Sequence, residues 1–121
     1  MKQVLVVDDS AVIRKVARRI LEGLHFRTSE APDGKLGLAE CERMMPDVIL
    51  LDWNMPEMDG LEFLCALRKM PGGTSPKVVF CTTENEVGHI ARAMHAGADD
   101  FIMKPFDRES VQAKFEGLGV C

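Results

Sequence analysis

Short apolar runs alternate along the chain with longer segments in which apolar residues recur every three or four positions. A short apolar run bounded by turn residues predicts a strand, and the longer recurrence predicts a helix. The strands are expected at 4–7, 26–30, 48–51, 78–81 and 101–103, and the helices at 11–23, 34–44, 60–70, 85–96 and 108–117. The mixed polar character of the second run is typical of an edge strand, whereas the other runs are typical of strands buried on both faces.

Residues that favour helix ends stand at several expected helix boundaries. Ser10 and Asp107 are suitable N-caps, and Gly23 and Gly97 are suitable C-terminal ends. Gly88 falls inside the expected fourth helix, where glycine lowers helix stability by about 1 kcal/mol relative to alanine. The first helix is expected to carry one apolar face, made of Val12, Val16 and Ile20.

Five repeats of strand and helix predict an α/β fold. Such alternation favours a parallel sheet with helices on both faces and right-handed crossovers. A polar second strand suits the edge of a flavodoxin-like, doubly wound (βα)5 sheet with strand order 2-1-3-4-5. The chain shows no internal linker or repeat, so residues 1–121 are expected to form a single domain with no output domain.

Composition excludes several classes of function. The chain has 121 residues, of which 46% are hydrophobic, and a formal charge of −4, which gives no electrostatic basis for binding nucleic acid. No apolar run approaches the roughly 18–20 residues that span a bilayer, and the N-terminus lacks a signal peptide. The four cysteines lie far apart, which predicts buried free thiols in a reducing cytosol rather than disulfides or zinc. A cytoplasmic monomer is expected.

Carboxylates follow two of the expected strands. Asp8 and Asp9 come directly after the first strand and Asp52 after the third. In the flavodoxin-like order these strands are neighbours, and their carboxyl ends flank the topological switch point where ligands bind. Any one of these residues alone is a plausible solvated loop residue, but three together repel one another unless a cation lies between them. An all-oxygen cluster favours a hard ion such as Mg²⁺.

Magnesium held by carboxylates usually accompanies phosphate chemistry. The chain contains no Gly-x-x-x-x-Gly-Lys loop, so nucleotide binding has little support. A carboxylate nucleophile that forms an aspartyl phosphate is the remaining route, and Asp52 is the candidate.

The chain resembles the receiver domains of response regulators over essentially its whole length, and in particular the single-domain receivers of chemotaxis signalling. The intervals from Asp52 to Thr82, 30 positions, and from Thr82 to Lys104, 22 positions, are close to those usual in that family. The motifs that carry the resemblance are Val6-Val7-Asp8-Asp9-Ser10, Asp52-x-x-Met55-Pro56-x-Met58-Asp59-Gly60, Thr82, and Gly97-Ala98-Asp99-Asp100-Phe101 through Lys104-Pro105-Phe106.

The resemblance implies a metal site around a phosphoacceptor. Asp52 would accept the phosphoryl group. Asp9 would bind Mg²⁺ directly, with Mn²⁺ as an alternative ion, and Asp8 would act through water or by orienting the other ligands. The backbone carbonyl of Asn54 would supply a further ligand together with Asp52 itself.

The resemblance also implies groups that contact the phosphoryl oxygens. Lys104 would supply positive charge, the Thr82 hydroxyl a hydrogen bond, and the backbone N–H of Thr83 another. Lys104 could instead be a surface lysine and Thr82 a cap of the fourth helix. The Lys104–Pro105 peptide bond is expected to be cis, as in the family.

A switch is implied as well. On phosphorylation Thr82 would move toward the phosphoryl group, and Phe101 would occupy the space that it leaves. The inward rotamer of Phe101 is expected to be more populated than that of a tyrosine, because phenylalanine lacks a hydroxyl to stabilise the exposed state. Partners would read the change on the surface of the fourth helix, fifth strand and fifth helix. Asn54 and Glu84 would line the path of hydrolytic water and give a short phosphoryl lifetime.

Three functions remain open. The first is a phospho-activated binding module, phosphorylated by a sensor histidine kinase and acting on an output protein, as in chemotaxis. The second is a relay that passes the phosphoryl group to a histidine phosphotransfer protein. The third, an enzyme of the haloacid dehalogenase type, is disfavoured because Asn54 stands where that family has an acid. We therefore expect a signalling phosphoacceptor rather than an enzyme.

Overall fold

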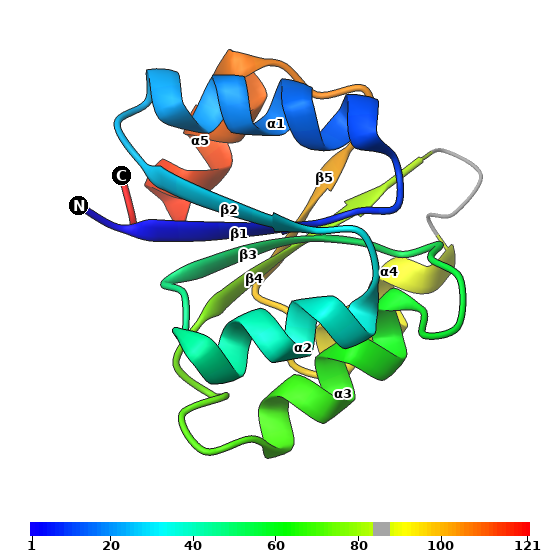
Figure 1. The fold of residues 1–121 in the computed structure, drawn as a ribbon. Helices are drawn as coiled ribbons and strands as arrows, with labels where there is room; N and C mark the ends of the chain where they lie inside the picture. Colours follow the sequence, from blue (N-terminus) through cyan, green and yellow to red (C-terminus); the bar gives the residue numbers. More distant parts are fainter. Residues whose placement is uncertain (84–87) are drawn as a thin grey trace.

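Five parallel strands form one sheet with helices on both of its faces (Figure 1). The structure is a computed structural model that describes residues 1–83 and 88–121. The strand order is β2-β1-β3-β4-β5, so the expected flavodoxin-like order is confirmed. The strands are β1 Gln3–Val7, β2 Arg27–Ala31, β3 Val48–Asp52, β4 Lys77–Thr82 and β5 Asp100–Met103.

The described helices agree with the expected ones except at the fourth. The helices are α1 Ala11–Gly23, α2 Gly34–Arg43, α3 Gly60–Lys69, α4 Ile90–His95 and α5 Arg108–Gly117. Residues 84–87 lie outside the described part of the chain, so the expected start of the fourth helix at Asn85 is not tested. Gly88 lies before the described helix in a 3₁₀ segment rather than inside it.

Side-chain caps begin the helices where the sequence predicts them. The Ser10 hydroxyl accepts a hydrogen bond from the backbone N–H of Ile13 at 3.3 Å and so starts α1. Asp107 forms a capping box with Ser110 at the start of α5. Each such contact satisfies an N–H group that would otherwise have no partner inside the helix.

Two hydrophobic clusters cover the two faces of the sheet. In Figure 1, α1 and α5 lie on one side of the sheet and α2, α3 and α4 on the other. The α1/α5 side buries residues such as Ala17, Leu21, Val111 and Phe115. The other side buries residues such as Cys41, Phe63, Leu64, Leu67 and Ala93. Because both faces are covered, the central strands are apolar throughout, as expected of a parallel sheet.

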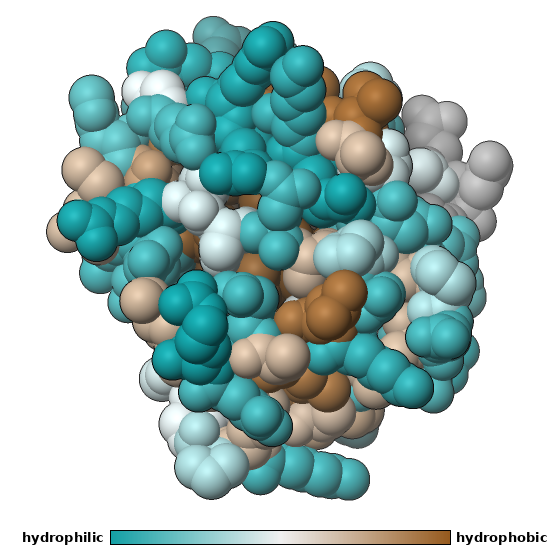
Figure 2. Space-filling model, in the orientation of Figure 1, coloured by the Kyte–Doolittle hydropathy of each residue, from teal (hydrophilic) through white to brown (hydrophobic). Residues whose placement is uncertain are grey.

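Of the expected apolar face of α1, only Ile20 packs against the core, while Val12 and Val16 are exposed. Val12 is 71% exposed and Val16 is 42% exposed, whereas Ala17 and Leu21 are buried against the sheet. Figure 2 shows a hydrophobic patch at the start of α1 on an otherwise mostly polar side. Two apolar stripes run along this helix, and only the position of the helix over the sheet decides which one is buried.

The cysteines are free, as expected, but two of them are not buried. Cys41 and Cys81 lie in the core, whereas Cys65 and Cys121 are exposed. Burial raises the pKa of the Cys41 thiol to about 11. None of the helices in the described ranges is long and apolar enough to cross a membrane.

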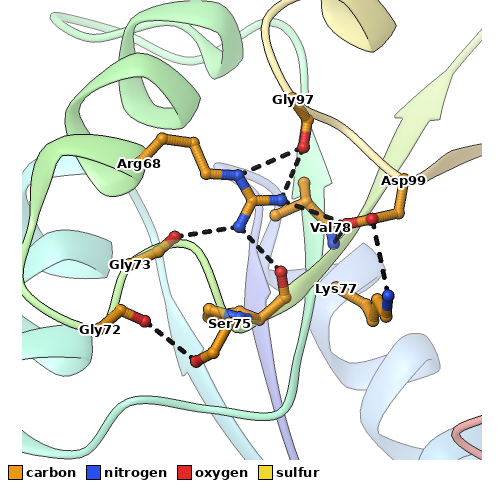
Figure 3. Close-up of polar contacts among 9 residues, drawn as sticks. Arg68, Gly72, Gly73, Ser75, Lys77, Val78, Gly97 and Asp99 are labelled. Atoms are coloured by element: carbon orange, nitrogen blue, oxygen red, sulfur yellow. Dashed lines mark hydrogen bonds and ion pairs between the residues drawn. The ribbon is translucent and has the colours of Figure 1, made fainter.

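Arg68 joins three segments at the edge of the sheet where β4 begins (Figure 3). Its guanidinium donates to the carbonyl oxygens of Gly73 at 3.0 Å, Pro76 at 2.8 Å and Gly97 at 2.6 Å. It also pairs with Asp99 at 3.2 Å. Arg68 therefore holds the turn after α4 against the end of α3 and the loop before β4.

Candidate functional site

The three expected carboxylates converge at the carboxyl edge of the sheet. Asp8 and Asp9 follow β1, and Asp52 is the last residue of the adjacent β3. One carboxylate oxygen from each residue lies within 4.8 Å of the other two. Asp8 and Asp52 are buried, and Asp9 is exposed. Strand register therefore brings together residues that are more than 40 positions apart in the chain.

Lys104 joins two of these carboxylates. Its Nζ lies 2.9 Å from Asp52 Oδ1 and 2.9 Å from Asp8 Oδ2. Lys104 follows β5, so it reaches the site from two strands away and is not an isolated surface lysine. The cluster contains three carboxyl groups and one ammonium group, that of Lys104. Its negative charge is therefore not fully compensated, and a bound cation could compensate the rest.

Burial controls the ionisation of this cluster. It raises the pKa of Asp52 to about 6, an effect that the hydrogen bond from Lys104 opposes and the nearby charge of Asp8 strengthens. Burial alone would lower the pKa of Lys104, but its hydrogen bonds to Asp52 and Asp8 outweigh this and raise it. At neutral pH Asp52 is therefore mainly an ionised carboxylate beside a protonated lysine.

Asp8 is oriented by contacts from α1. Its Oδ1 accepts the backbone N–H of Ser10 at 2.9 Å, while its backbone carbonyl accepts Arg14 Nη1 at 2.6 Å. Arg14 is in turn held by Glu30 of β2 at 2.7 Å. The sequence analysis did not identify Arg14, because nothing in its spacing distinguishes it from the other basic residues of α1. Both carboxylate oxygens of Asp8 already accept protein hydrogen bonds.

A close backbone approach shapes the loop that follows Asp52. The N–H of Gly60 donates to the carbonyl of Trp53 at 2.8 Å. A Cβ atom at Gly60 would lie only 2.5 Å from the carbonyl oxygen of Asp52, so a larger residue could not start α3 here. Packing therefore requires glycine at position 60.

The expected phosphoryl-binding groups surround the same edge. Thr82 ends β4 and is buried, and its hydroxyl donates to the carbonyl of Thr83 at 3.3 Å. Thr83 is half-buried and Asn54 is exposed. Glu84, expected to tune the phosphoryl lifetime, lies outside the described residues.

Phe101 lies in β5 with its ring half-buried. It packs against the core cluster on the α3/α4 side of the sheet. Lys114 of α5 places its Nζ 4.5 Å from the ring centroid and pairs with Asp100 at 3.2 Å. The ring is therefore not fully outward in this structure. The expected rotamer populations stay a prediction.

The donor set fits magnesium. Asp8, Asp9 and Asp52 offer only oxygen atoms, and no His or Cys belongs to this cluster. Hard divalent ions prefer such ligands.

The sequence of this chain matches a known protein family over most of its length. The sequence pattern described as "Response regulator receiver domain" matches residues 4–116. The chain belongs to the response regulator receiver domain family. The resemblance drawn from the sequence is thus confirmed.

Relatives of this receiver include chemotaxis and transcriptional regulators. It is 35% identical over 117 residues to chemotaxis protein CheY of Listeria monocytogenes, covering 96% of this chain and 97% of the relative. It is 40% identical over 114 residues to the KDP operon transcriptional regulatory protein KdpE of Escherichia coli, covering 94% of this chain and 49% of KdpE. The solved structure of Vibrio cholerae CheY4 matches with a TM-score of 0.91 and 32% identity, covering 97% of this chain and 98% of that chain.

A stacked aromatic pair lies beside the site of this receiver. The rings of Trp53 and His89 are 4.2 Å apart between centroids and inclined by 16°. Trp53, which directly follows Asp52, is only 7% exposed. His89 and Trp53 are 36 positions apart in the chain, and no sequence pattern predicts their contact.

Proposed function

We propose that this receiver is a phosphoacceptor response regulator whose Asp52 is phosphorylated by a sensor histidine kinase in the presence of Mg²⁺. The observation that carries the proposal is the Lys104 ammonium, which lies between Asp52 and Asp8 with Asp9 adjacent. A buried nucleophile, a fixed cation and an oxygen-only metal site are the parts that phosphoryl transfer to a carboxylate needs.

In the transfer, an oxygen of Asp52 forms a bond to phosphorus as the bond from phosphorus to the donor histidine nitrogen breaks. The electron pair of that bond returns to the imidazole ring. Because the pKa of Asp52, about 6, lies below neutral pH, the nucleophilic carboxylate is the main form of this residue at pH 7. Lys104 holds Asp52 Oδ1 at 2.9 Å and so orients the carboxylate for attack.

Charge compensation is divided among the surrounding groups. Asp9, Asp52 and the backbone carbonyl of Asn54 would hold Mg²⁺, which when bound neutralises charge on the phosphoryl oxygens. Mn²⁺ offers the same chemistry. Asp8 would orient this set rather than bind the ion directly, since both of its carboxylate oxygens accept hydrogen bonds from protein groups. The N–H of Thr83 would donate to a phosphoryl oxygen.

The output of the reaction is a changed surface. Thr82 would redirect its hydroxyl from the carbonyl of Thr83 to the phosphoryl group, and Phe101 would move into the space beside it. The surface of α4, β5 and α5 would then recognise an output protein, as a chemotaxis-type regulator does. Asn54 and Glu84 would admit hydrolytic water and limit the lifetime of the phosphorylated state.

The exposed start of α1 supports a protein partner near the acceptor. Val12 and Val16 lie one helical turn apart at the start of α1 and form an exposed apolar pair beside the basic residue Lys15. An exposed apolar patch rimmed by charge is typical of a protein-binding surface. We assign the sensor histidine kinase to this patch. A monomeric state and a cytoplasmic location stay predictions.

The proposal is tested with acetyl phosphate and Mg²⁺. Wild-type protein should gain one phosphoryl group in intact-mass spectrometry, and Asp52→Asn should gain none. Asp47→Asn, which removes an exposed carboxylate elsewhere, is the matched control and should be phosphorylated like wild type. Undiminished phosphorylation of Asp52→Asn would overturn the proposal. Capture of an output protein by the beryllofluoride-bound form would favour a binding module, whereas transfer to a histidine phosphotransfer protein would favour the relay.

A further inference from the structure

The Trp53–His89 stack connects the phosphoacceptor strand to the start of α4. Trp53 directly follows Asp52, and its indole also contacts Phe80 of β4 at 5.0 Å between ring centroids. The near-parallel imidazole of His89 lies 4.2 Å from the same indole. Stacked rings at this distance stabilise one another beyond the area they bury. The stack thus joins β3, β4 and the residue that precedes Ile90.

Helix capping does not explain the histidine at this position. His89 is the N-cap residue of α4, yet its side chain makes no capping hydrogen bond, and its backbone is helical at φ −87° and ψ −12°. A Cβ atom added at the preceding Gly88 would meet none of the described residues within 4 Å. The ring of His89 connects this end of α4 to Trp53, the residue that follows the phosphoacceptor strand.

The opposite end of α4 is held differently. Arg68 donates to the carbonyl of Gly97 from two nitrogens, at 2.6 and 3.2 Å, and pairs with Asp99 (Figure 3). The turn after α4 is thus anchored by several hydrogen bonds, whereas the Trp53–His89 stack is a single ring contact at the described start of the helix. A single ring contact is weaker than several hydrogen bonds, so we expect the start of α4 to be displaced more readily than its end.

We propose that His89 is a positioning residue that holds α4 in the arrangement in which Asp52 pairs with Lys104. This inference rests on the proposed phosphorylation of Asp52. In this arrangement the Thr82 hydroxyl donates to the carbonyl of Thr83 and not to Asp52. Stacking on Trp53 stabilises that arrangement and opposes the phosphorylated one. An aromatic pair of this kind corresponds to about a two- to tenfold change in an equilibrium constant.

The experiment compares His89→Ala, His89→Phe and His95→Ala with wild type. Each protein is titrated with beryllofluoride in the presence of Mg²⁺, and binding is measured from the NMR amide signals of β4. The rate of phosphorylation by acetyl phosphate is measured separately. His89→Ala should bind beryllofluoride about two- to tenfold more tightly and be phosphorylated faster. His89→Phe keeps a ring on the indole and should match wild type. His95→Ala changes an exposed histidine on the same helix and should also match.

The outcomes separate this inference from the proposed function. A purely structural role would lower the melting temperature of His89→Ala with no change in beryllofluoride affinity, and that result would overturn the inference. So would a His89→Phe variant that behaves like His89→Ala. Should His89→Ala fail to fold, His89→Gln replaces it with the same expectation. Failure of wild type to be phosphorylated at Asp52 would overturn the proposed function and the inference with it.

Discussion

Lys104 and Asp52 are 52 positions apart in the sequence, and their side chains meet at 2.9 Å at the carboxyl edge of the sheet. Asp52 is buried and Lys104 is partly buried, and the lysine also pairs with Asp8. Burying a carboxylate is unfavourable even with a partner, and the raised pKa of Asp52 reflects this. The site is therefore maintained at the expense of stability.

Asp52→Asn should stabilise the fold. In Mg²⁺-free buffer at pH 7 the free energy of unfolding should rise by about 2 kcal/mol, because the variant buries no charge at this position. Urea denaturation measures the difference. The control is Asp47→Asn, an exposed site, which should not gain stability. A less stable Asp52→Asn protein would show that the pair with Lys104 outweighs the burial of the carboxylate.

The Asp52 carboxyl should make the free energy of unfolding depend on pH. The pKa of Asp52 is about 6 in the folded protein, above its ordinary value of 3.8. Between these values the folded state holds a proton that the unfolded state releases, so this group's contribution to stability falls as pH rises from about 4 to 6. Urea curves of wild type and Asp52→Asn across this range should diverge with increasing pH. Parallel curves would contradict the raised pKa.

The contribution of Glu30 to stability should change with pH in the opposite direction, and at lower pH. Hydrogen bonds from Arg14 and Arg18 lower the pKa of its carboxyl below the ordinary 4.5. A lowered pKa contributes stability above pH 4.5 that is lost as pH falls through the folded-state value. Glu30→Gln should lose up to about 1 kcal/mol at pH 7, as expected of a partly exposed ion pair, and progressively less in acid. Glu42→Gln, at an exposed site on α2, should follow wild type throughout.

Magnesium should stabilise the protein through the carboxylate cluster. When free Mg²⁺ is tenfold above its Kd, the free energy of unfolding should rise by about 1.4 kcal/mol. Asp9→Asn removes one charge from the cluster and should weaken Mg²⁺ binding about tenfold or more. Thermal unfolding across a Mg²⁺ series measures both effects. Glu109→Gln makes the same change of charge at an exposed position on α5, and a similar loss there would argue against a site at Asp9.

Arg68→Ala should be strongly destabilising. The variant leaves the carbonyls of Gly73, Pro76 and Gly97 without this donor and Asp99 without its ion pair (Figure 3). We expect a loss of about 2–4 kcal/mol in urea denaturation. Arg68→Lys should recover little, because a lysine cannot donate to several acceptors in one plane. Arg92→Ala, at an exposed site on α4, should be near neutral.

Much of the fold could be predicted because its signals are local. Apolar runs mark the strands, and Ser10 and Asp107 cap helices where expected. The polar second strand is indeed the edge of the sheet. The convergence of Asp8, Asp9 and Asp52 followed from strand order alone, since the carboxyl ends of neighbouring parallel strands meet at one edge.

Other features had no local signal. The exposure of Val12 and Val16 depends on how α1 lies over the sheet, not on its own periodicity. The contacts of Arg14 with the Asp8 carbonyl and of His89 with Trp53 join segments whose spacing in the chain shows no pattern. The exposure of Cys65 likewise reflects its side of α3.

The sequence by itself determined the order of the elements, their caps and the chemical types gathered at one sheet edge, because propensity, capping and strand order depend on neighbouring residues and on topology. Only the tertiary structure decided which face of α1 is buried, that Lys104 bridges Asp52 and Asp8, and that His89 stacks on Trp53. These depend on register and helix placement, which set distances between residues far apart in the chain. Burial then sets the pKa of Asp52, a property that the residue type alone does not have.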